Sequence, residues 1–158
     1  MKTSDIAKLV AAVGVSLCAG IIGSFFTVSA IPAWYASLVH PALNPPAWVF
    51  APVWTTLYIL MGVAAFLVWR RGLGWREIRA ALGLFSVQLV LNTLWSVLFF
   101  GLHSPGAALI DIVFLWLAIV ATMIAFAKIS RAAMYLLAPY LLWVSFAMYL
   151  NCAIWLLN

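Results

Sequence analysis

The stretch WYASLVHPALNPPAWVFAPVWTTLY, residues 34–58, interrupts a chain that otherwise reads as plain membrane helix. Five of the seven prolines lie between Pro32 and Pro52. Proline removes a backbone donor and pushes the residue before it toward an extended conformation, so we expect residues 32–48 to form a stiff, non-helical loop. A simple connection does not need large aromatic rings, and this stretch is rich in them. We therefore predict that the loop is a lid over a cavity.

The chain on either side of this loop is strongly apolar. Of its 158 residues, 68% are hydrophobic and 7% are charged, with a mean hydropathy of +1.20, which excludes a soluble globular domain. A membrane-spanning helix needs about 20 apolar residues. We predict an all-α membrane protein, a bundle of five transmembrane helices at about 6–31, 49–69, 79–100, 107–127 and 134–157. These helices leave no room for a second domain, so residues 1–158 are expected to form one domain.

The charges predict how the chain lies in the bilayer. If five helices alternate across the membrane, all eight basic residues fall on one side: Lys2, Lys8, Arg70, Arg71, Arg76, Arg79, Lys128 and Arg131. Basic residues stay preferentially on the cytoplasmic side, so we expect the N-terminus there, with the lid loop and the C-terminus on the opposite side. Whether the membrane is an inner or an outer one is left open. The net charge of +5 thus indicates the lipid bilayer as a partner and not nucleic acid.

A cleaved signal peptide is an alternative interpretation of the N-terminus. Val28-Ser29-Ala30 resembles a cleavage site that follows a basic start and an apolar run. The apolar run is long and Asp5 interrupts the basic start, so we favour a first transmembrane helix.

One predicted helix carries most of the polar side chains within the membrane. Gln88, Asn92, Trp95 and Phe99 follow at helical spacing, so they share a face. A buried amide must find a partner in hydrocarbon, and this face is expected to point into the bundle. For Gln88 we expect a bond between helices, whereas Asn92 is a candidate for ligand contact. Asp111 lies near the start of its helix, where a structural role is favoured and a functional one is left open.

The sequence lacks the usual catalytic and cofactor motifs. It has no nucleotide-binding glycine loop, no HExxH or CxxC motif and no recognisable catalytic triad. The two histidines, His40 and His103, fall in predicted loops, where a solvated histidine is commoner than a metal or haem ligand. We therefore expect no metal site and no required cofactor.

Aromatic side chains remain as the main candidates for function. Several share helix faces with small or polar residues, and we expect these faces to converge on a pocket with stacking surfaces and a few hydrogen-bonding groups. The candidate ligand-binding residues are Tyr35, Trp48, Trp54, Tyr58, Asn92, Trp95, Phe99, Tyr140, Trp143, Ala147 and Leu150. The competing explanation is an aromatic belt at the membrane interface, which suits Trp69, Trp75 and Trp155 better.

The spacing of these residues resembles that of the TspO/MBR family, which includes tryptophan-rich sensory proteins and the translocator protein, or peripheral benzodiazepine receptor. The similarity runs from residue 34 to the end of the chain. The matching motifs are Trp34-Tyr35-x-x-Leu38-x-x-Pro41, Pro45-Pro46-x-Trp48, Pro52-x-Trp54-x-x-Leu57-Tyr58, Gln88-x-x-x-Asn92-x-x-Trp95, Phe99-Phe100-Gly101, Asp111 and Pro139-Tyr140-x-x-Trp143-x-x-Phe146-Ala147-x-x-Leu150-Asn151. The first helix matches only in character.

The resemblance implies a five-helix bundle, usually a homodimer, with a pocket under the first loop that binds porphyrins and synthetic benzodiazepine-type ligands. The pocket residues of the family match Trp54, Asn92, Trp95, Trp143, Ala147 and Leu150. Trp34 and Trp143 match tryptophans implicated in light-dependent porphyrin breakdown. They are the catalytic candidates if the protein is an enzyme.

The chain departs from the family pattern in two places. His40 and Leu43 stand where the family often has Lys and Trp, which weakens any cationic contact to porphyrin carboxylates. Near the end of the last helix, Cys152 and Leu156 replace the Tyr and the basic residue of the sterol-recognition pattern. This second departure argues against high-affinity sterol binding.

These observations lead to three hypotheses. We expect first a membrane-embedded binding protein, or receptor, for porphyrin-like, flat, hydrophobic ligands that acts in sensing or transport. The second is an enzyme that degrades porphyrin photo-oxidatively through Trp34 and Trp143. The third is a structural membrane module without a specific ligand, whose aromatic residues only pack.

Overall fold

Five long helices make up the computed structural model, which describes residues 3–158 and leaves Lys2 outside its range. They are α1 (Thr3–Ala30), α2 (Ala47–Trp69), α3 (Arg76–Ser96), α4 (Pro105–Ala127) and α5 (Arg131–Leu157), and the π-helical turns η1 (Ile31–Tyr35) and η2 (Val97–Gly101) continue α1 and α3. The described range contains no strand, and all five helices are long and apolar enough to cross a membrane. The predicted all-α bundle of five transmembrane helices is confirmed.

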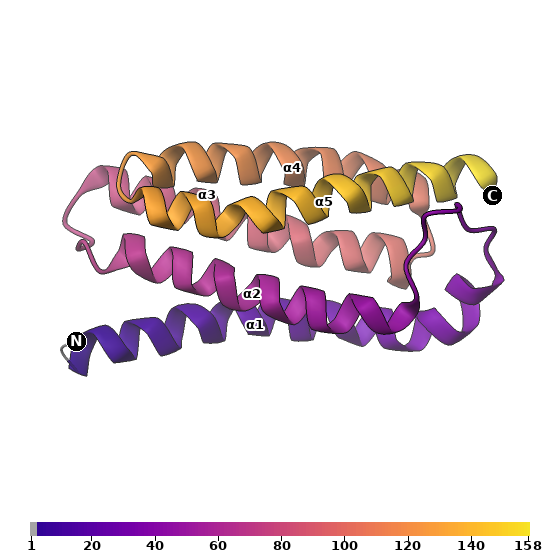
Figure 1. Ribbon diagram of the computed structural model, residues 1–158, viewed down its shortest axis with the longest axis horizontal. Coiled ribbons are helices and arrows are strands. Elements are labelled where there is room, and N and C mark those ends of the chain that lie inside the picture. The colour runs from indigo at the N-terminus through magenta and orange to yellow at the C-terminus, as the bar shows by residue number, and fades with distance from the viewer. Residues whose placement is uncertain (1–2) are drawn as a thin grey trace.

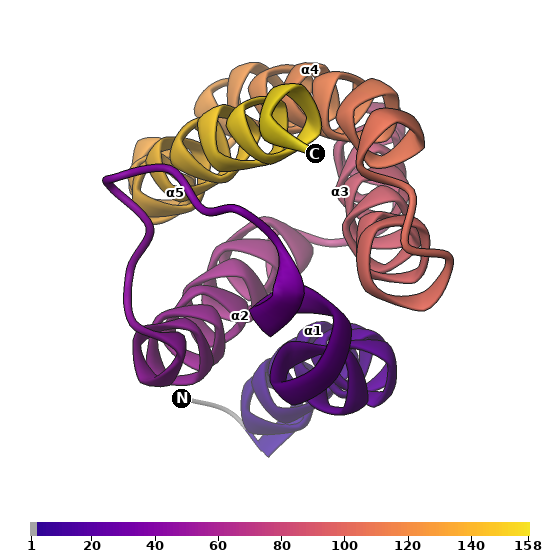
Figure 2. The ribbon, with the colours of Figure 1, turned by 90° about the vertical axis from the view of Figure 1, so that its right-hand side faces the viewer.

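The helices alternate in direction (Figure 1). The start of α1 lies at the same end of the bundle as the α2–α3 and α4–α5 connections, and the α1–α2 connection lies at the other end, with the C-terminus. Seen along their length, the helices form a ring in the order α1, α2, α5, α4, α3 (Figure 2), and each is in contact with its ring neighbours. The α1–α2 connection crosses one end of this ring and passes close to α5 (Figure 2).

The α1–α2 connection begins later in the chain than we predicted from the positions of its prolines. We expected a non-helical loop over residues 32–48, but the chain stays helical through Ser37 and α2 begins at Ala47, so the connection spans residues 38–46. In an α-helix the ring of Pro32 would crowd the carbonyl of residue 28. The wider π-helical turn η1 contains Pro32 and relieves this crowding. The prediction was wrong for residues 32–37 and 47–48, and Trp34 therefore lies on a helix.

Local sequence signals explain where other helices begin. Pro105 occupies the start of α4, where the missing proline donor costs nothing because that nitrogen has no helical partner. The Oγ of Ser130 caps α5 by accepting a hydrogen bond from the N–H of Ala133 at 3.4 Å. Both α3 and α5 begin at an arginine, slightly before the starts at about 79 and 134 that hydropathy indicated.

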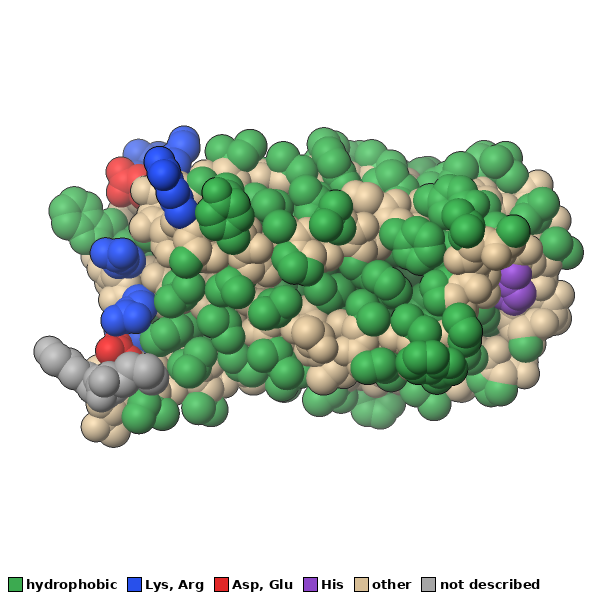
Figure 3. Space-filling model, in the orientation of Figure 1, with side chains coloured by type: hydrophobic (Ala, Val, Ile, Leu, Met, Phe, Trp, Pro, Cys, Tyr) green, Lys and Arg blue, Asp and Glu red, His purple; other side chains and the backbone are tan. Residues whose placement is uncertain are grey.

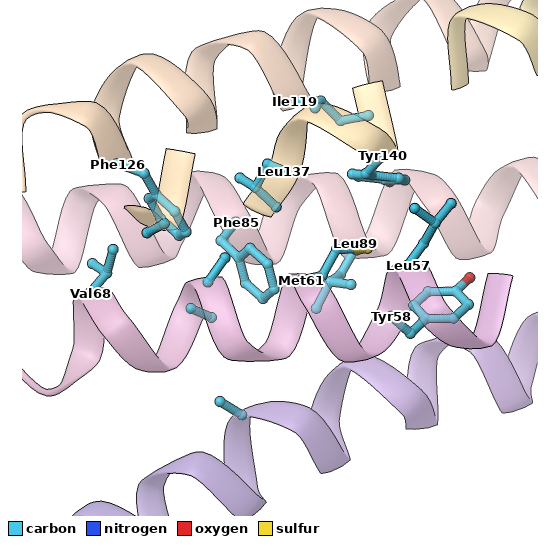
Figure 4. Close-up of a cluster of buried hydrophobic side chains, with 14 of the residues drawn as sticks. Leu57, Tyr58, Met61, Val68, Phe85, Leu89, Ile119, Phe126, Leu137 and Tyr140 are labelled. Atoms are coloured by element: carbon cyan, nitrogen blue, oxygen red, sulfur yellow. The ribbon is translucent and has the colours of Figure 1, made fainter. Parts of the chain in front are cut away.

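Apolar side chains from α2, α3, α4 and α5 fill the centre of the ring (Figure 4). Met61, Ile119 and Leu137 are almost completely buried there. On the other side of α2, a Cβ on Gly62 would lie 2.9 Å from Cγ2 of Val13, so α1 and α2 approach closely only because this residue is glycine. This tight contact lies in the half of the bundle that holds the N-terminus.

Basic side chains gather at one end of the bundle, and the long face seen in Figure 3 is mainly hydrophobic. The described basic residues at or near that end are Lys8, Arg70, Arg71, Arg76, Arg79, Lys128 and Arg131. A long apolar surface with charges confined to one end suits a chain surrounded by hydrocarbon. The protein is an integral, multi-pass membrane protein.

Candidate functional site

A cavity of about 350 Å³ occupies the half of the bundle next to the α1–α2 connection. This volume lies within the range of about 300–1,000 Å³ that is typical of small-molecule pockets. Residues of α1, η1, α2, α3, η2 and α5 form its wall, and most of them are apolar or aromatic. The cavity therefore lies inside the bundle and borders the packed core, to which Tyr58 belongs.

Three tryptophans from three helices supply the flat surfaces of the cavity: Trp54 of α2, Trp95 of α3 and Trp143 of α5. Trp54 stacks on Tyr58 with ring centres 5.7 Å apart and an interplanar angle of 29°. Trp143 meets Phe50 edge to face, with ring centres 6.1 Å apart. Because aromatic faces pack well against other flat rings, these walls suit a flat, hydrophobic ligand.

Hydrogen bonds and stacking fix the position of Trp95. Its Nε1 donates to Oδ1 of Asn151 at 2.9 Å, and Nδ2 of Asn151 donates to the carbonyl of Pro105 at 2.7 Å. The other side of the ring stacks on Phe99, with ring centres 5.1 Å apart. Three elements, α5, α4 and η2, thus hold one cavity wall in a single orientation.

A buried chain of polar groups supports the wall formed by Tyr58. The hydroxyl of Tyr58 donates to Oδ1 of Asn92, and Nδ2 of Asn92 donates to the hydroxyl of Tyr140 at 3.1 Å. Asn92 and Tyr140 are only 2% and 0% exposed and do not line the cavity. The amide predicted to contact a ligand directly lies behind Tyr58, and its predicted effect on a ligand would act through that ring.

The indole nitrogen of Trp143 is an unused donor beside the cavity. Within residues 3–158, its Nε1 is buried and has no hydrogen-bond partner, although the ring itself lines the cavity. Buried donors in proteins are nearly always paired, so an unpaired one needs an explanation. An acceptor on a ligand would reach this N–H only after the ring moved, because the nitrogen itself has almost no accessible surface.

The structure brings seven of the eleven ligand-binding candidates together at the cavity. They are Tyr35, Trp54, Tyr58, Trp95, Trp143, Ala147 and Leu150. The other four lie elsewhere: Trp48 is 75% exposed at the start of α2, while Asn92, Phe99 and Tyr140 are buried behind the wall. Ligand contact by these four side chains stays a prediction, and for Asn92, Phe99 and Tyr140 it requires the wall to move.

Trp34 lies apart from Trp143, outside the main cavity. It lines a separate surface groove and stacks on His103, with ring centres 4.5 Å apart and an interplanar angle of 14°. Phe99 separates Trp34 from Trp95: its ring centre is 5.5 Å from that of Trp34 and 5.1 Å from that of Trp95. The two predicted catalytic tryptophans are therefore not on one binding surface.

Helix α1 contributes more of the cavity wall than its sequence suggested. Gly20, Gly23, Ser24 and Thr27 all line the cavity. A Cβ on Gly20 would collide with the ring of Tyr58, so this glycine makes room for a cavity-lining aromatic side chain. The spacing of Gly20 and Ser24 within a series of small residues was the available signal, but the same spacing is typical of plain helix packing.

The α1–α2 connection caps the end of the bundle. None of residues 36–46 lines the cavity. The hydroxyl of Tyr35 donates to Oδ1 of Asn44 at 2.8 Å, and the side-chain amide of Asn158 pairs with both the backbone N–H and the carbonyl of Val39, at 2.9 and 3.2 Å. The predicted lid is thus fastened at both sides, and only its flanking residues reach the cavity.

Two buried polar side chains lack the partners expected for them. We expected Gln88 to bond to another helix, but it is 1% exposed and neither of its amide atoms has a partner within residues 3–158. This prediction was wrong because no donor or acceptor of the described residues lies within hydrogen-bonding distance of the Gln88 amide. Asp111 is also buried, at 6% exposure, with Oδ2 unpaired among the described residues.

Comparisons with known proteins give consistent results. The sequence model described as the TspO/MBR family matches residues 12–156. The tryptophan-rich protein TspO of Chlorobaculum tepidum is 50% identical over 156 residues, which cover 98% of each chain. The tryptophan-rich protein TspO of Archaeoglobus fulgidus is 45% identical over 154 residues, 98% of this chain and 99% of its own. The translocator protein of Homo sapiens is 42% identical over 135 residues, 85% of this chain and 80% of its own.

Proposed function

The chain belongs to the TspO/MBR family, as its motifs predicted, and we propose that it is a membrane-embedded binding protein for flat, hydrophobic ligands of the porphyrin type. The observation that carries this proposal is the cavity walled by Trp54, Trp95 and Trp143. Stacking on these rings would supply most of the binding energy, because flat apolar ligands bury large areas against aromatic faces. If its ring turns toward the cavity, the unpaired Nε1 of Trp143 would orient the ligand by donating to an acceptor on it.

The role of such binding would be sensing or transport. Similar proteins carry the names tryptophan-rich sensory protein and translocator protein, and both names fit a cavity that holds a ligand within the membrane. A flat and hydrophobic ligand is sufficient to explain why aromatic and apolar residues line the cavity. Synthetic ligands of the benzodiazepine type would compete for the same rings.

The orientation that we propose puts the basic end of the bundle in the cytoplasm. Seven described basic residues lie at that end, and the opposite end has none. The positive-inside rule then places the cavity in the outer half of the membrane. A porphyrin would reach this half from the non-cytoplasmic leaflet.

An equilibrium titration tests the proposal. Protoporphyrin IX is added to the protein in lipid nanodiscs, and quenching of tryptophan fluorescence is followed to saturation. We expect Trp143→Ala to weaken binding by about tenfold, the equivalent of about 1.4 kcal/mol, because it removes one stacking face. The matched control is Trp75→Ala, which removes an exposed tryptophan at the basic end. Equal affinity of wild type and Trp143→Ala, or quenching that never saturates, would contradict the proposal.

A further inference from the structure

The wall of the cavity is not equally covered on all sides. Six of its lining residues are exposed on the surface of the bundle, and all six belong to α1 or α2: Ile21, Ser24, Val28, Ala47, Ala51 and Thr55. The lining residues from α3, η2 and α5 are buried or only half exposed. A residue that lines a cavity and is also exposed marks an edge of its opening. The opening therefore lies between α1 and α2.

The geometry of the two helices explains this opening. Near the basic half they are in tight contact, where Val13 meets Gly62 and Gly20 meets Tyr58. Beyond Gly20, one face of α1 carries residues 21, 24 and 28, spaced three and four apart. Because α2 runs in the opposite direction, these residues face 55, 51 and 47 of α2, in that order. Ser24 and Ala51, at the centre of the two faces, have small side chains that leave a gap. The hydroxyls of Ser24 and Thr55 do not bridge it, because each bonds to a carbonyl of its own helix.

The opposite approach, through the end of the bundle, is closed. The connection over residues 38–46 is held by the paired Asn158 amide and Val39 backbone and by the bond from Tyr35 to Asn44. The ring of His40 packs on Tyr35, with ring centres 4.6 Å apart. A ligand arriving from water would have to break these contacts, whereas a ligand dissolved in lipid meets an opening.

We propose that ligands enter and leave the cavity sideways, from the hydrocarbon of the bilayer, through the opening between α1 and α2. This inference rests on the proposed binding function and adds the route. It selects ligands that partition into the membrane and that are thin enough to pass between Ser24 and Ala51. On this route the α1–α2 connection is a fixed cap that the ligand does not pass. A macrocycle wider than the cavity can project through the opening between α1 and α2 into lipid.

The test compares the rates at which the ligand binds and is released. Binding of protoporphyrin IX to the protein in nanodiscs is followed by stopped-flow fluorescence, and release is followed by dilution into empty vesicles. Ser24→Phe narrows the opening from α1 and Ala51→Phe narrows it from α2. We expect each variant to slow both binding and release by about tenfold, because a blocked passage raises the barrier in both directions. A ring that only fills part of the cavity would instead speed release.

Two further variants complete the test. Ser86→Phe places the same ring on an exposed serine of α3, whose hydroxyl also bonds to a carbonyl one turn back, and should leave both rates unchanged. Asn158→Ala removes the two hydrogen bonds to the backbone of Val39 and should also leave both rates unchanged. If Asn158→Ala accelerates exchange while Ser24→Phe and Ala51→Phe do not slow it, ligands use the end of the bundle and the proposed route is wrong.

Failure of the route and failure of the binding function give different results. If wild type shows no saturable quenching at equilibrium, the binding function fails before any rate is compared. Thermal unfolding in detergent identifies a variant that does not fold, and Ser24→Leu and Ala51→Leu, which add smaller side chains, then replace it. Normal rates in folded narrowed variants overturn the proposed route.

Discussion

Trp95 donates its indole N–H to Oδ1 of Asn151 at 2.9 Å, so a side chain of α5 orients the ring that α3 contributes to the cavity. The same amide donates to the carbonyl of Pro105 at the start of α4. One buried asparagine thus joins three helices at the level of the cavity. Its removal should affect stability and ligand binding together.

We predict that Asn151→Leu lowers both the stability of the protein and its affinity for the ligand. The change leaves the Trp95 donor unpaired and removes the bond to the Pro105 carbonyl, which costs about 1–2 kcal/mol for bonds between membrane helices. The unfolding temperature in detergent should fall, and protoporphyrin affinity should fall several-fold because Trp95 loses its fixed orientation. Both are measured on the same preparation.

The control for Asn151→Leu is Ser145→Ala. Ser145 accepts a hydrogen bond from the indole N–H of Trp116 at 2.9 Å, away from the cavity. This variant removes an indole bond of the same length without touching a cavity wall. It should leave protoporphyrin affinity unchanged, and an equal loss of affinity in both variants would disconnect the orientation of Trp95 from binding.

Gly20→Ala should reshape the cavity. The added methyl collides with the ring of Tyr58 and pushes that ring away from Asn92 or into the cavity. We expect a loss of affinity for protoporphyrin and a lower unfolding temperature. Gly14→Ala is the matched control, because no atom lies within 4 Å of its added methyl. The control should be neutral or slightly more stable, by about 0.5–1 kcal/mol, since alanine favours the helix. Equal behaviour of both variants would disprove the role of Gly20.

Tyr140→Phe should separate stability from binding. The hydroxyl of Tyr140 accepts a bond from Asn92 and is fully buried behind the cavity wall. Its loss leaves one amide donor unpaired, which costs about 1–3 kcal/mol. We expect a lower unfolding temperature with little change in protoporphyrin affinity. A large loss of affinity at unchanged stability would instead show direct contact between Tyr140 and the ligand.

Trp34→Phe should leave equilibrium binding intact. Trp34 stacks on His103 in a surface groove and is separated from Trp95 by Phe99. We expect the same affinity for protoporphyrin as wild type, in contrast to Trp143→Phe. Absorbance of bound porphyrin under illumination tests the catalytic alternative in the same samples. Bleaching at the same rate in wild type, Trp34→Phe and Trp143→Phe would exclude a catalytic role for these tryptophans.

Much of the architecture follows from the sequence. Long apolar segments have few stable solutions in a bilayer, so hydropathy and the one-sided distribution of Lys and Arg were sufficient for the five-helix bundle. The start of the first connection was not predictable in this way. Pro32 lies in a helical extension of α1 because a π-helical turn accommodates its ring. The conformational preferences of the residues around Pro32 do not distinguish such a turn from a loop.

The cavity could be predicted only where large side chains form it. Trp54, Trp95 and Trp143 were identified because tryptophan beside small or polar residues is unusual for lipid-facing helix. The α1 wall was missed because Gly20 and Gly23 contribute space and no side chain. Asn92 lies behind Tyr58, and this placement depends on how α2, α3 and α5 pack together. Helix periodicity alone does not determine that packing.

Whether a flat ligand binds between the three tryptophans is tested by locating the bound ligand. Crystals of the protein grown with palladium(II) protoporphyrin, whose square-planar metal takes no axial ligand, allow anomalous scattering to place the metal. We predict one strong peak inside the cavity, with the macrocycle against Trp54, Trp95 and Trp143. A peak in the groove of Trp34 and His103, or on the outer surface of the bundle with the cavity empty, would show that the ligand does not bind between the three tryptophans.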